Sequence, residues 1–115
     1  MNIQIFGKPK CFDTKKAERF FKERGIKYQY IDLKSKGFSR GELESVVKAA
    51  GGLDEIIDKA SKSQGAVLIK YLSGDDAKFE KLLEDGTLIR TPVVRNGKKA
   101  AVGYQPDIWE KWTKE

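Results

Sequence analysis

The sequence predicts one α/β domain with a β-α-β unit at its N-terminal end, a β-β-α unit at its C-terminal end and a helical segment between them. Three observations lead to this fold class. Strand-like runs flank a helical pattern in the first third, helix-start signals recur in the middle, and an Asn-Gly pair separates two apolar runs near the end. The 115 residues suffice to bury one core. We expect residues 1–34 and 88–115 to form that core, with residues 35–87 as a helical insert.

The β-α-β pattern occupies the first 34 residues. Apolar and polar residues alternate from Asn2 to Phe6, which is typical of a half-buried strand. A helix is expected from about Phe12 or Asp13 to Arg24, because apolar residues recur along one side and Gly25 is a typical residue just past a helix end. Residues 27–33 are rich in aromatic and branched side chains and predict a second strand. Such a crossover joins parallel strands.

The middle of the chain predicts helices. Ser39 and Glu42 match a capping box, so a helix is expected from there to about Ala50. A short helix over residues 53–60 and a longer one from residues 73–76 to Gly86 are expected after it. Residues 66–72 are a short apolar run whose pattern leaves both a strand and a buried helix open.

The C-terminal unit is a hairpin followed by a helix. Residues 91–95 and 98–103 predict two strands joined at Asn96-Gly97, the strongest short-range hairpin signal. Pro106 then introduces a helix over residues 107–114, as prolines often do at a first helical turn. With the two earlier strands, the hairpin gives a mixed four-stranded sheet. Four aromatic residues are expected to pack against this sheet rather than to bind bases: Tyr28, Tyr30, Trp109 and Trp112.

Composition narrows the function classes. The net charge of +6 comes from interspersed charges without a long basic run, which favours a solvated mixed surface over direct nucleic-acid binding. A basic cleft for an anionic substrate or an acidic partner is the alternative. The absence of histidine excludes a Cys-His or Ser-His-Asp nucleophile and any histidine-ligated metal site, and we expect no metal.

The expected location is the cytoplasm. The single cysteine cannot form an intramolecular disulfide, which suits a reducing compartment. No apolar run approaches the length of a membrane span, and the N-terminal residues predict a strand rather than a signal peptide.

Cys11 is the candidate reactive residue, because it stands where a loop meets the start of a helix. Free backbone N–H groups and the helix dipole stabilise a thiolate there, and Lys8 and Lys10 add positive charge. The Thr14 hydroxyl, three residues on, can donate to the thiolate, whereas the Asp13 carboxylate competes for the same N–H groups. The same donors can hold an oxyanion. The alternative is an inert, buried thiol.

Two arginines flank the strand that contains Pro92. Arg90 and Arg95 either line an anionic pocket beside Cys11 or are exposed charges at the edge of the strand. The residue pattern alone leaves both open, because proline disturbs the alternation of a strand.

The chain resembles the arsenate reductase-related family, which includes ArsC, Spx and YffB types. The resemblance rests on Lys10-Cys11-Phe12-Asp13-Thr14-Lys15-Lys16-Ala17, on Tyr30-Ile31-Asp32-Leu33, on Thr91-Pro92-Val93-Val94, and on Asn96-Gly97-Lys98 with Gly103 before the last helix. These segments follow in order and cover essentially the whole chain.

The resemblance implies a thioredoxin-like fold with an inserted helical subdomain. It also implies that Cys11 is a nucleophile and that the bond before Pro92 is cis, with the proline facing the cysteine. Enzymatic members reduce arsenate with glutathione and glutaredoxin, and other members act on thiol substrates. No bound cofactor is implied, and glutathione or another external thiol is the expected co-substrate. Spx-type members instead bind RNA polymerase and regulate transcription.

This chain differs from the pattern of that family at four places. Thr91 and Tyr104 stand where arsenate-reducing members carry arginines, and the insert offers Lys59 and Lys62 instead of a third arginine. Thr14 stands where Spx-type sensors have a second cysteine, so an internal disulfide switch is impossible. We therefore expect a cysteine-dependent thiol oxidoreductase that acts on a small oxyanion or on a thiol or disulfide, with glutaredoxin or thioredoxin as possible partner. The alternative is a non-catalytic regulator that binds RNA polymerase.

Overall fold

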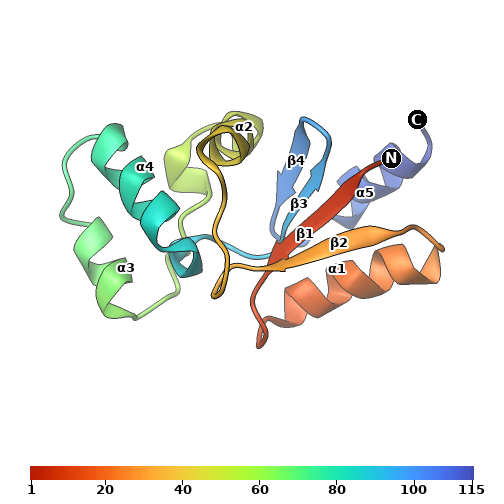
Figure 1. Cartoon of the computed structure of the whole chain (residues 1–115), viewed down its shortest axis with the longest axis horizontal. Helices are drawn as coiled ribbons and strands as arrows, with labels where there is room; N and C mark the ends of the chain where they lie inside the picture. The colour runs from red at the N-terminus through yellow and green to blue at the C-terminus, as the bar shows by residue number, and fades with distance from the viewer.

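A computed structural model describes all residues from 1 to 115. The elements follow one another along the chain as shown in Figure 1. They are β1 (Ile3–Gly7), α1 (Phe12–Glu23), β2 (Tyr28–Asp32), α2 (Arg40–Ala50), the 3₁₀ turn η1 (Leu53–Glu55), α3 (Gln64–Ile69), α4 (Asp75–Glu84), η2 (Gly86–Leu88), β3 (Val93–Asn96), β4 (Lys99–Val102) and α5 (Pro106–Thr113).

The four strands form one mixed sheet in the order β2-β1-β3-β4. β1 runs parallel to β2, as expected for the first crossover, and β3 runs antiparallel to both β1 and β4. The hairpin between β3 and β4 turns at Gly97, whose φ of 63° is readily adopted by glycine. The predicted mixed four-stranded sheet is confirmed.

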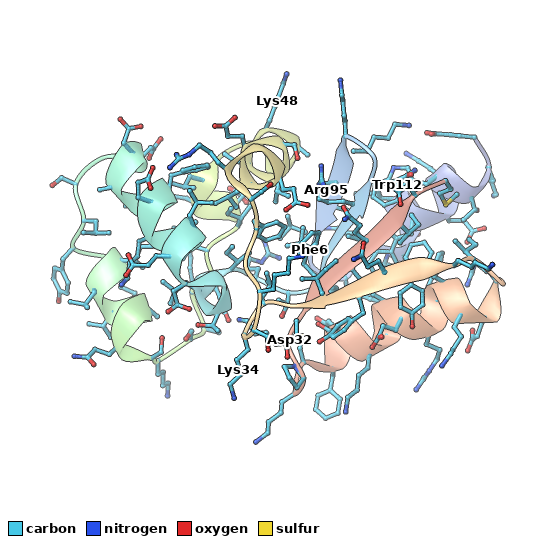
Figure 2. The ribbon with its side chains drawn as sticks, in the orientation of Figure 1. Phe6, Asp32, Lys34, Lys48, Arg95 and Trp112 are labelled. Carbon is cyan, nitrogen blue, oxygen red and sulfur yellow. The ribbon has the colours of Figure 1, made fainter.

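Two apolar clusters cover the two faces of the sheet. On one face α1 and α5 pack against β1, β3 and β4, and Phe21 and Trp109 are fully buried there. On the other face the segment from α2 to η2 packs against Phe6 and its neighbours. Phe6 stacks on Phe38 with ring centroids 4.1 Å apart, and Figure 2 shows Phe6 between the sheet and the insert. The insert therefore shares its core with the sheet.

The insert differs from the prediction in one segment. Residues 53–60 do not form a helix beyond the three residues of η1. Ile57 instead pairs with Ile89 in an isolated antiparallel bridge, and the Asp58 carboxylate accepts from the N–H of Ala60. The bridge to Ile89 ties the segment to the residues just before β3, which outweighs its weak helical pattern.

The ambiguous run over residues 66–72 is resolved as a short helix. α3 begins after Ser63, whose hydroxyl oxygen accepts from the N–H of Ala66. Ala66 and Ile69 are buried in the larger core cluster, while Val67, Leu68 and Tyr71 are exposed. None of the helices in the structure combines the length and the apolar character needed to cross a membrane.

Candidate active site

Cys11 lies at the carboxyl end of β1, as the N-cap residue of α1. Its own N–H donates to the Lys8 carbonyl at 3.2 Å, which closes the loop between the strand and the helix. The backbone at Cys11 is extended, with φ −91° and ψ 116°, and the side chain is partly exposed. The thiol is thus held at a helix start and remains accessible, which argues against the inert alternative.

Thr91, eighty positions further along the chain, contacts the thiol directly. Its hydroxyl donates to Cys11 Sγ at 3.1 Å, and the thiol donates to the Thr91 carbonyl at 3.7 Å. The peptide bond between Thr91 and Pro92 is cis, as the resemblance implied. The Pro92 carbonyl accepts from the N–H of Gly103 at 2.8 Å, which fixes this turn against the end of β4.

The surroundings of Cys11 favour the thiolate. Burial raises the pKa of Cys11, but four hydrogen-bond donors outweigh it: the Thr14 hydroxyl, the Thr91 hydroxyl, and the backbone N–H groups of Thr14 and Asp13. The net effect is a pKa below the ordinary value of cysteine. A larger share of the thiol is therefore ionised at neutral pH than in a free cysteine.

Thr14 is held against the thiol by close packing. It is 1 % exposed, and a Cβ added to Gly7 would lie 2.2 Å from its Cγ2. Only glycine at the end of β1 leaves room for this side chain. The Thr14 hydroxyl has no hydrogen-bond partner of ordinary geometry beside the neutral thiol. Ionisation of Cys11 supplies the acceptor that this buried hydroxyl lacks.

The two predicted lysines play a smaller part than expected. Lys8 Nζ lies 3.4 Å from Asp58 Oδ2, so its charge is paired with the insert. Lys10 is exposed and makes no ion pair. The groups that lower the pKa of Cys11 are hydroxyl and backbone donors, not these ammonium groups. The structure brings Thr14, Thr91 and Pro92 together at Cys11, with the lysines outside that contact shell.

The two predicted arginines point to other partners. Arg90 Nη1 donates to the Glu55 carbonyl at 2.9 Å. Arg90 Nη2 packs against Gly103, where an added Cβ would lie only 3.0 Å from this nitrogen. Arg95 lies opposite Gln4 in the sheet, roughly 10 Å along β1 from Gly7 at ~3.3 Å per residue.

Arg95 is held between the sheet and α2. Its guanidinium donates to Gln4 Oε1 at 2.8 Å and lies 3.5 Å from Glu42 Oε2. The sequence left open whether Arg90 and Arg95 line a pocket at Cys11, and in the structure the contacts of their guanidinium groups are to Glu55, Gln4 and Glu42.

Thr91 was expected among the residues that stabilise the thiolate or bind substrate, and its hydroxyl donates to the sulfur. Two other features of the site were not predicted. Tyr30, expected to pack, is 37 % exposed; burial, Asp32, Glu18 and the Cys11 thiolate together raise its pKa. Phe12, next to Cys11, is 79 % exposed. Its place outside the apolar stripe of α1 is a signal that the sequence did offer.

The fold and the site define a thioredoxin-like protein with a single activated cysteine at the start of α1. The ArsC family model matches residues 6–112, and the chain therefore belongs to the ArsC family. Its curated relatives include the protein YusI of Bacillus subtilis, 26 % identical over 96 % of this chain and 98 % of that protein. The global transcriptional regulator Spx 2 of Oceanobacillus iheyensis is 30 % identical over 93 % of this chain and 80 % of that protein.

Solved structures share the fold. The arsenate reductase from Vibrio cholerae superposes with a TM-score of 0.82 at 22 % identity, covering 96 % of this chain and 97 % of that one. The protein SACOL0876 from Staphylococcus aureus COL superposes with a TM-score of 0.73 at 24 % identity, covering 95 % and 96 %. At these identities the likeness shows the fold alone.

Proposed function

We propose that this protein is a thiol oxidoreductase in which the Cys11 thiolate attacks a disulfide, above all a glutathione mixed disulfide, or an oxyanion such as arsenate. One observation carries the proposal: the Thr91 hydroxyl donates to a partly exposed sulfur at the start of α1, where the Thr14 hydroxyl and two backbone N–H groups also favour the thiolate. Four donors at one sulfur stabilise the anion that acts as nucleophile. Membership of the ArsC family supports the same chemistry.

The proposed cycle needs an external thiol. The Cys11 thiolate attacks the glutathione sulfur of a mixed disulfide, the old S–S bond breaks, and the substrate leaves as a thiolate that takes a proton from water. A glutathione thiolate then attacks the new mixed disulfide, which releases oxidised glutathione and restores Cys11. Each turnover thus exchanges one disulfide for another: one external glutathione thiol is oxidised to the disulfide level, and the substrate sulfur is reduced to a thiol. The chain has no second cysteine to take the place of glutathione, or of a glutaredoxin or thioredoxin, in this step.

Arsenate is the weaker of the two substrate types for this site. Thr91 donates one hydrogen bond where an arginine would offer a planar fork to a tetrahedral oxyanion. Tyr104 packs edge-on against Trp109 with ring centroids 5.6 Å apart and carries no charge for the substrate. The helix start and its free N–H groups supply the remaining oxyanion donors.

Steady-state assays test the proposal. The wild-type protein is given a glutathione mixed disulfide with glutathione and glutathione reductase, or arsenate with glutathione, glutaredoxin and the same reductase. We expect turnover of the mixed disulfide at a higher kcat/KM than that of arsenate. Absence of turnover with both substrates would contradict the oxidoreductase proposal.

Thr91→Val is expected to change the pH profile of the reaction with a small disulfide. Loss of the hydroxyl donor raises the pKa of Cys11, so less thiolate is present at neutral pH. A more basic thiolate is also more nucleophilic, which recovers about half of the loss on a logarithmic scale. We expect a rate about threefold lower below the pKa and higher than wild type once both thiols are fully ionised.

The measurement is the rate constant of the single thiol with a chromogenic disulfide between about pH 5 and pH 10. Thr87→Val is the matched control, because the Thr87 hydroxyl donates to Asp85 and not to Cys11. Parallel profiles for wild type and Thr91→Val would mean that the Thr91 hydroxyl does not stabilise the thiolate.

A second candidate function is transcriptional regulation through RNA polymerase. The specific observation in its favour is the identity of 30 % to the global transcriptional regulator Spx 2 of Oceanobacillus iheyensis, over 93 % of this chain. Thr14 replaces the second cysteine of the sensing pair, so binding of this kind would not respond to an internal disulfide. Surface plasmon resonance with purified RNA polymerase tests it. Binding that is saturable and independent of the oxidation state of Cys11 is the expected result for a regulator.

A further inference from the structure

Phe12 is an exposed aromatic residue that directly follows the reactive cysteine in the chain. It is the first residue of α1, directly after Cys11, and 79 % of it is accessible to solvent. It belongs to neither apolar cluster, so its ring contributes to no core. Pro9, on the other side of Cys11 in the chain, is also exposed. The approach to the thiol therefore has an apolar surface that folding does not use.

The charges around this ring are positive. Four lysines and one aspartate lie between residues 8 and 16. Lys8 is paired with Asp58 and Lys16 with Asp13, which leaves Lys10 and Lys15 without ion pairs. Lys15 Nζ lies 5.9 Å from the centroid of the Phe12 ring.

A further lysine stands at the same end of the sheet. Lys34 follows β2, and the N–H of Leu33 next to it donates to the Gly7 carbonyl at 2.9 Å, just before the loop that leads to Cys11. Figure 2 shows Lys34 pointing away from the molecule into solvent. Its charge is therefore free to meet a partner that approaches the thiol.

We propose that Phe12, with Lys15 beside its ring and Lys10 and Lys34 at the same end of the sheet, selects a polypeptide substrate whose disulfide-bonded cysteine is flanked by apolar and acidic residues. An apolar side chain of the substrate covers the Phe12 ring and removes its surface from water, and the acidic residues meet the unpaired lysines. Complementary charge also raises the rate of encounter. A small oxyanion or a small disulfide uses none of these contacts. This inference rests on the proposed oxidoreductase function and names its substrate class.

The chemistry is the exchange already described, with the substrate chain as leaving group. The Cys11 thiolate attacks the glutathione sulfur of the polypeptide mixed disulfide, and the polypeptide leaves as a thiolate and is protonated by water. Glutathione then reduces Cys11 and is itself oxidised to its disulfide. Phe12 takes part in no bond change and is a specificity-determining residue.

The test compares three substrates, each a mixed disulfide with glutathione. The first is a short peptide with leucine and glutamate on both sides of its cysteine. The second is a short peptide with serine and lysine at the same positions. The third is the mixed disulfide of mercaptoethanol and glutathione. For the wild type we expect the highest kcat/KM with the leucine-glutamate peptide. Phe12→Ala is expected to lower the ratio of kcat/KM between this peptide and mercaptoethanol about fivefold, equal to about 1 kcal/mol, mainly through KM.

Tyr71→Ala is the matched control. Tyr71 is an aromatic residue of the same exposure, 80 %, that follows α3 at the end of the molecule remote from the sheet (Figure 1). Its removal should leave the ratio unchanged, and Phe12→Leu should restore most of it. Lys10→Glu should lower the ratio at low salt, and the loss should shrink as added salt screens the charge.

The outcomes separate the inference from the function on which it rests. Turnover of mercaptoethanol without preference for the leucine-glutamate peptide overturns the substrate class and leaves the oxidoreductase proposal standing. An equal loss with Phe12→Ala on all three substrates overturns it as well, since the residue then acts on the thiol rather than on recognition. Absence of turnover with every substrate overturns both.

Discussion

Cys11→Ser is expected to lower turnover of a glutathione mixed disulfide by at least about a thousandfold, because a serine hydroxyl does not form an anion at neutral pH. The donors at this position cannot compensate. They favour a negative charge that a thiol can carry near neutral pH and a hydroxyl cannot. The change is measured as kcat/KM in the assay with glutathione and glutathione reductase.

The same variant separates the two functions considered for this chain. Serine is close in size to cysteine, and Cys11 is only partly buried, so the variant should fold and melt much as the wild type does. Circular dichroism and a thermal scan check this. A regulator that binds RNA polymerase through its surface would keep its affinity in Cys11→Ser. Turnover retained by the variant would remove the nucleophile from the proposal.

Local sequence signals predicted most of the fold. The capping box at Ser39 and Glu42 is present with both of its hydrogen bonds, because its partners lie only three residues apart. The Asn96-Gly97 turn and the helix that Pro106 begins follow from equally local preferences. The prediction of a helix over residues 53–60 was wrong because the conformation of this segment depends on its pairing with Ile89, which is distant in the sequence.

The site was predictable at Cys11 and much less so around it. The helix start follows from the residues beside the cysteine, whereas the partners of long charged side chains depend on how distant elements meet. Arg95 is paired with Glu42 only because α2 packs against the sheet. Lys8 is paired with Asp58 only because the insert contacts the loop between β1 and α1. Charge near a nucleophile in the sequence therefore says little about charge near it in space.

Dipoles rather than charges activate this thiol. Hydroxyl and backbone N–H groups are held by packing, so they keep their orientation when a substrate approaches. Exposed lysines keep their charges free for a partner instead. The sequence has four lysines near Cys11, but two of them are paired with aspartates in the structure, and the side chain that donates to the sulfur is Thr91.

Gly7→Ala is expected to destabilise the protein and to weaken the activation of Cys11 in one step. The added Cβ would lie 2.2 Å from Thr14 Cγ2 and 2.8 Å from its hydroxyl oxygen, well inside contact distance. Both residues are buried, so neither can move into solvent. Overpacking of this kind costs about 1–3 kcal/mol, which lowers the Tm of a domain of this size by roughly 5–15 °C.

Gly41→Ala is the matched control, and its expected change in stability has the opposite sign. Gly41 lies in α2 and has no atom within 4 Å of an added Cβ, so alanine gains helix propensity there without a clash, up to about 1 kcal/mol. Thermal unfolding of both variants and the pH dependence of thiol alkylation measure the two effects. Displacement of the Thr14 hydroxyl should raise the pKa of Cys11 in Gly7→Ala and leave it unchanged in Gly41→Ala. If Gly7→Ala instead has the Tm of the wild type and keeps the lowered pKa of Cys11, Gly7 does not position Thr14 at the sulfur. In that case Thr14 is not one of the groups that stabilise the thiolate.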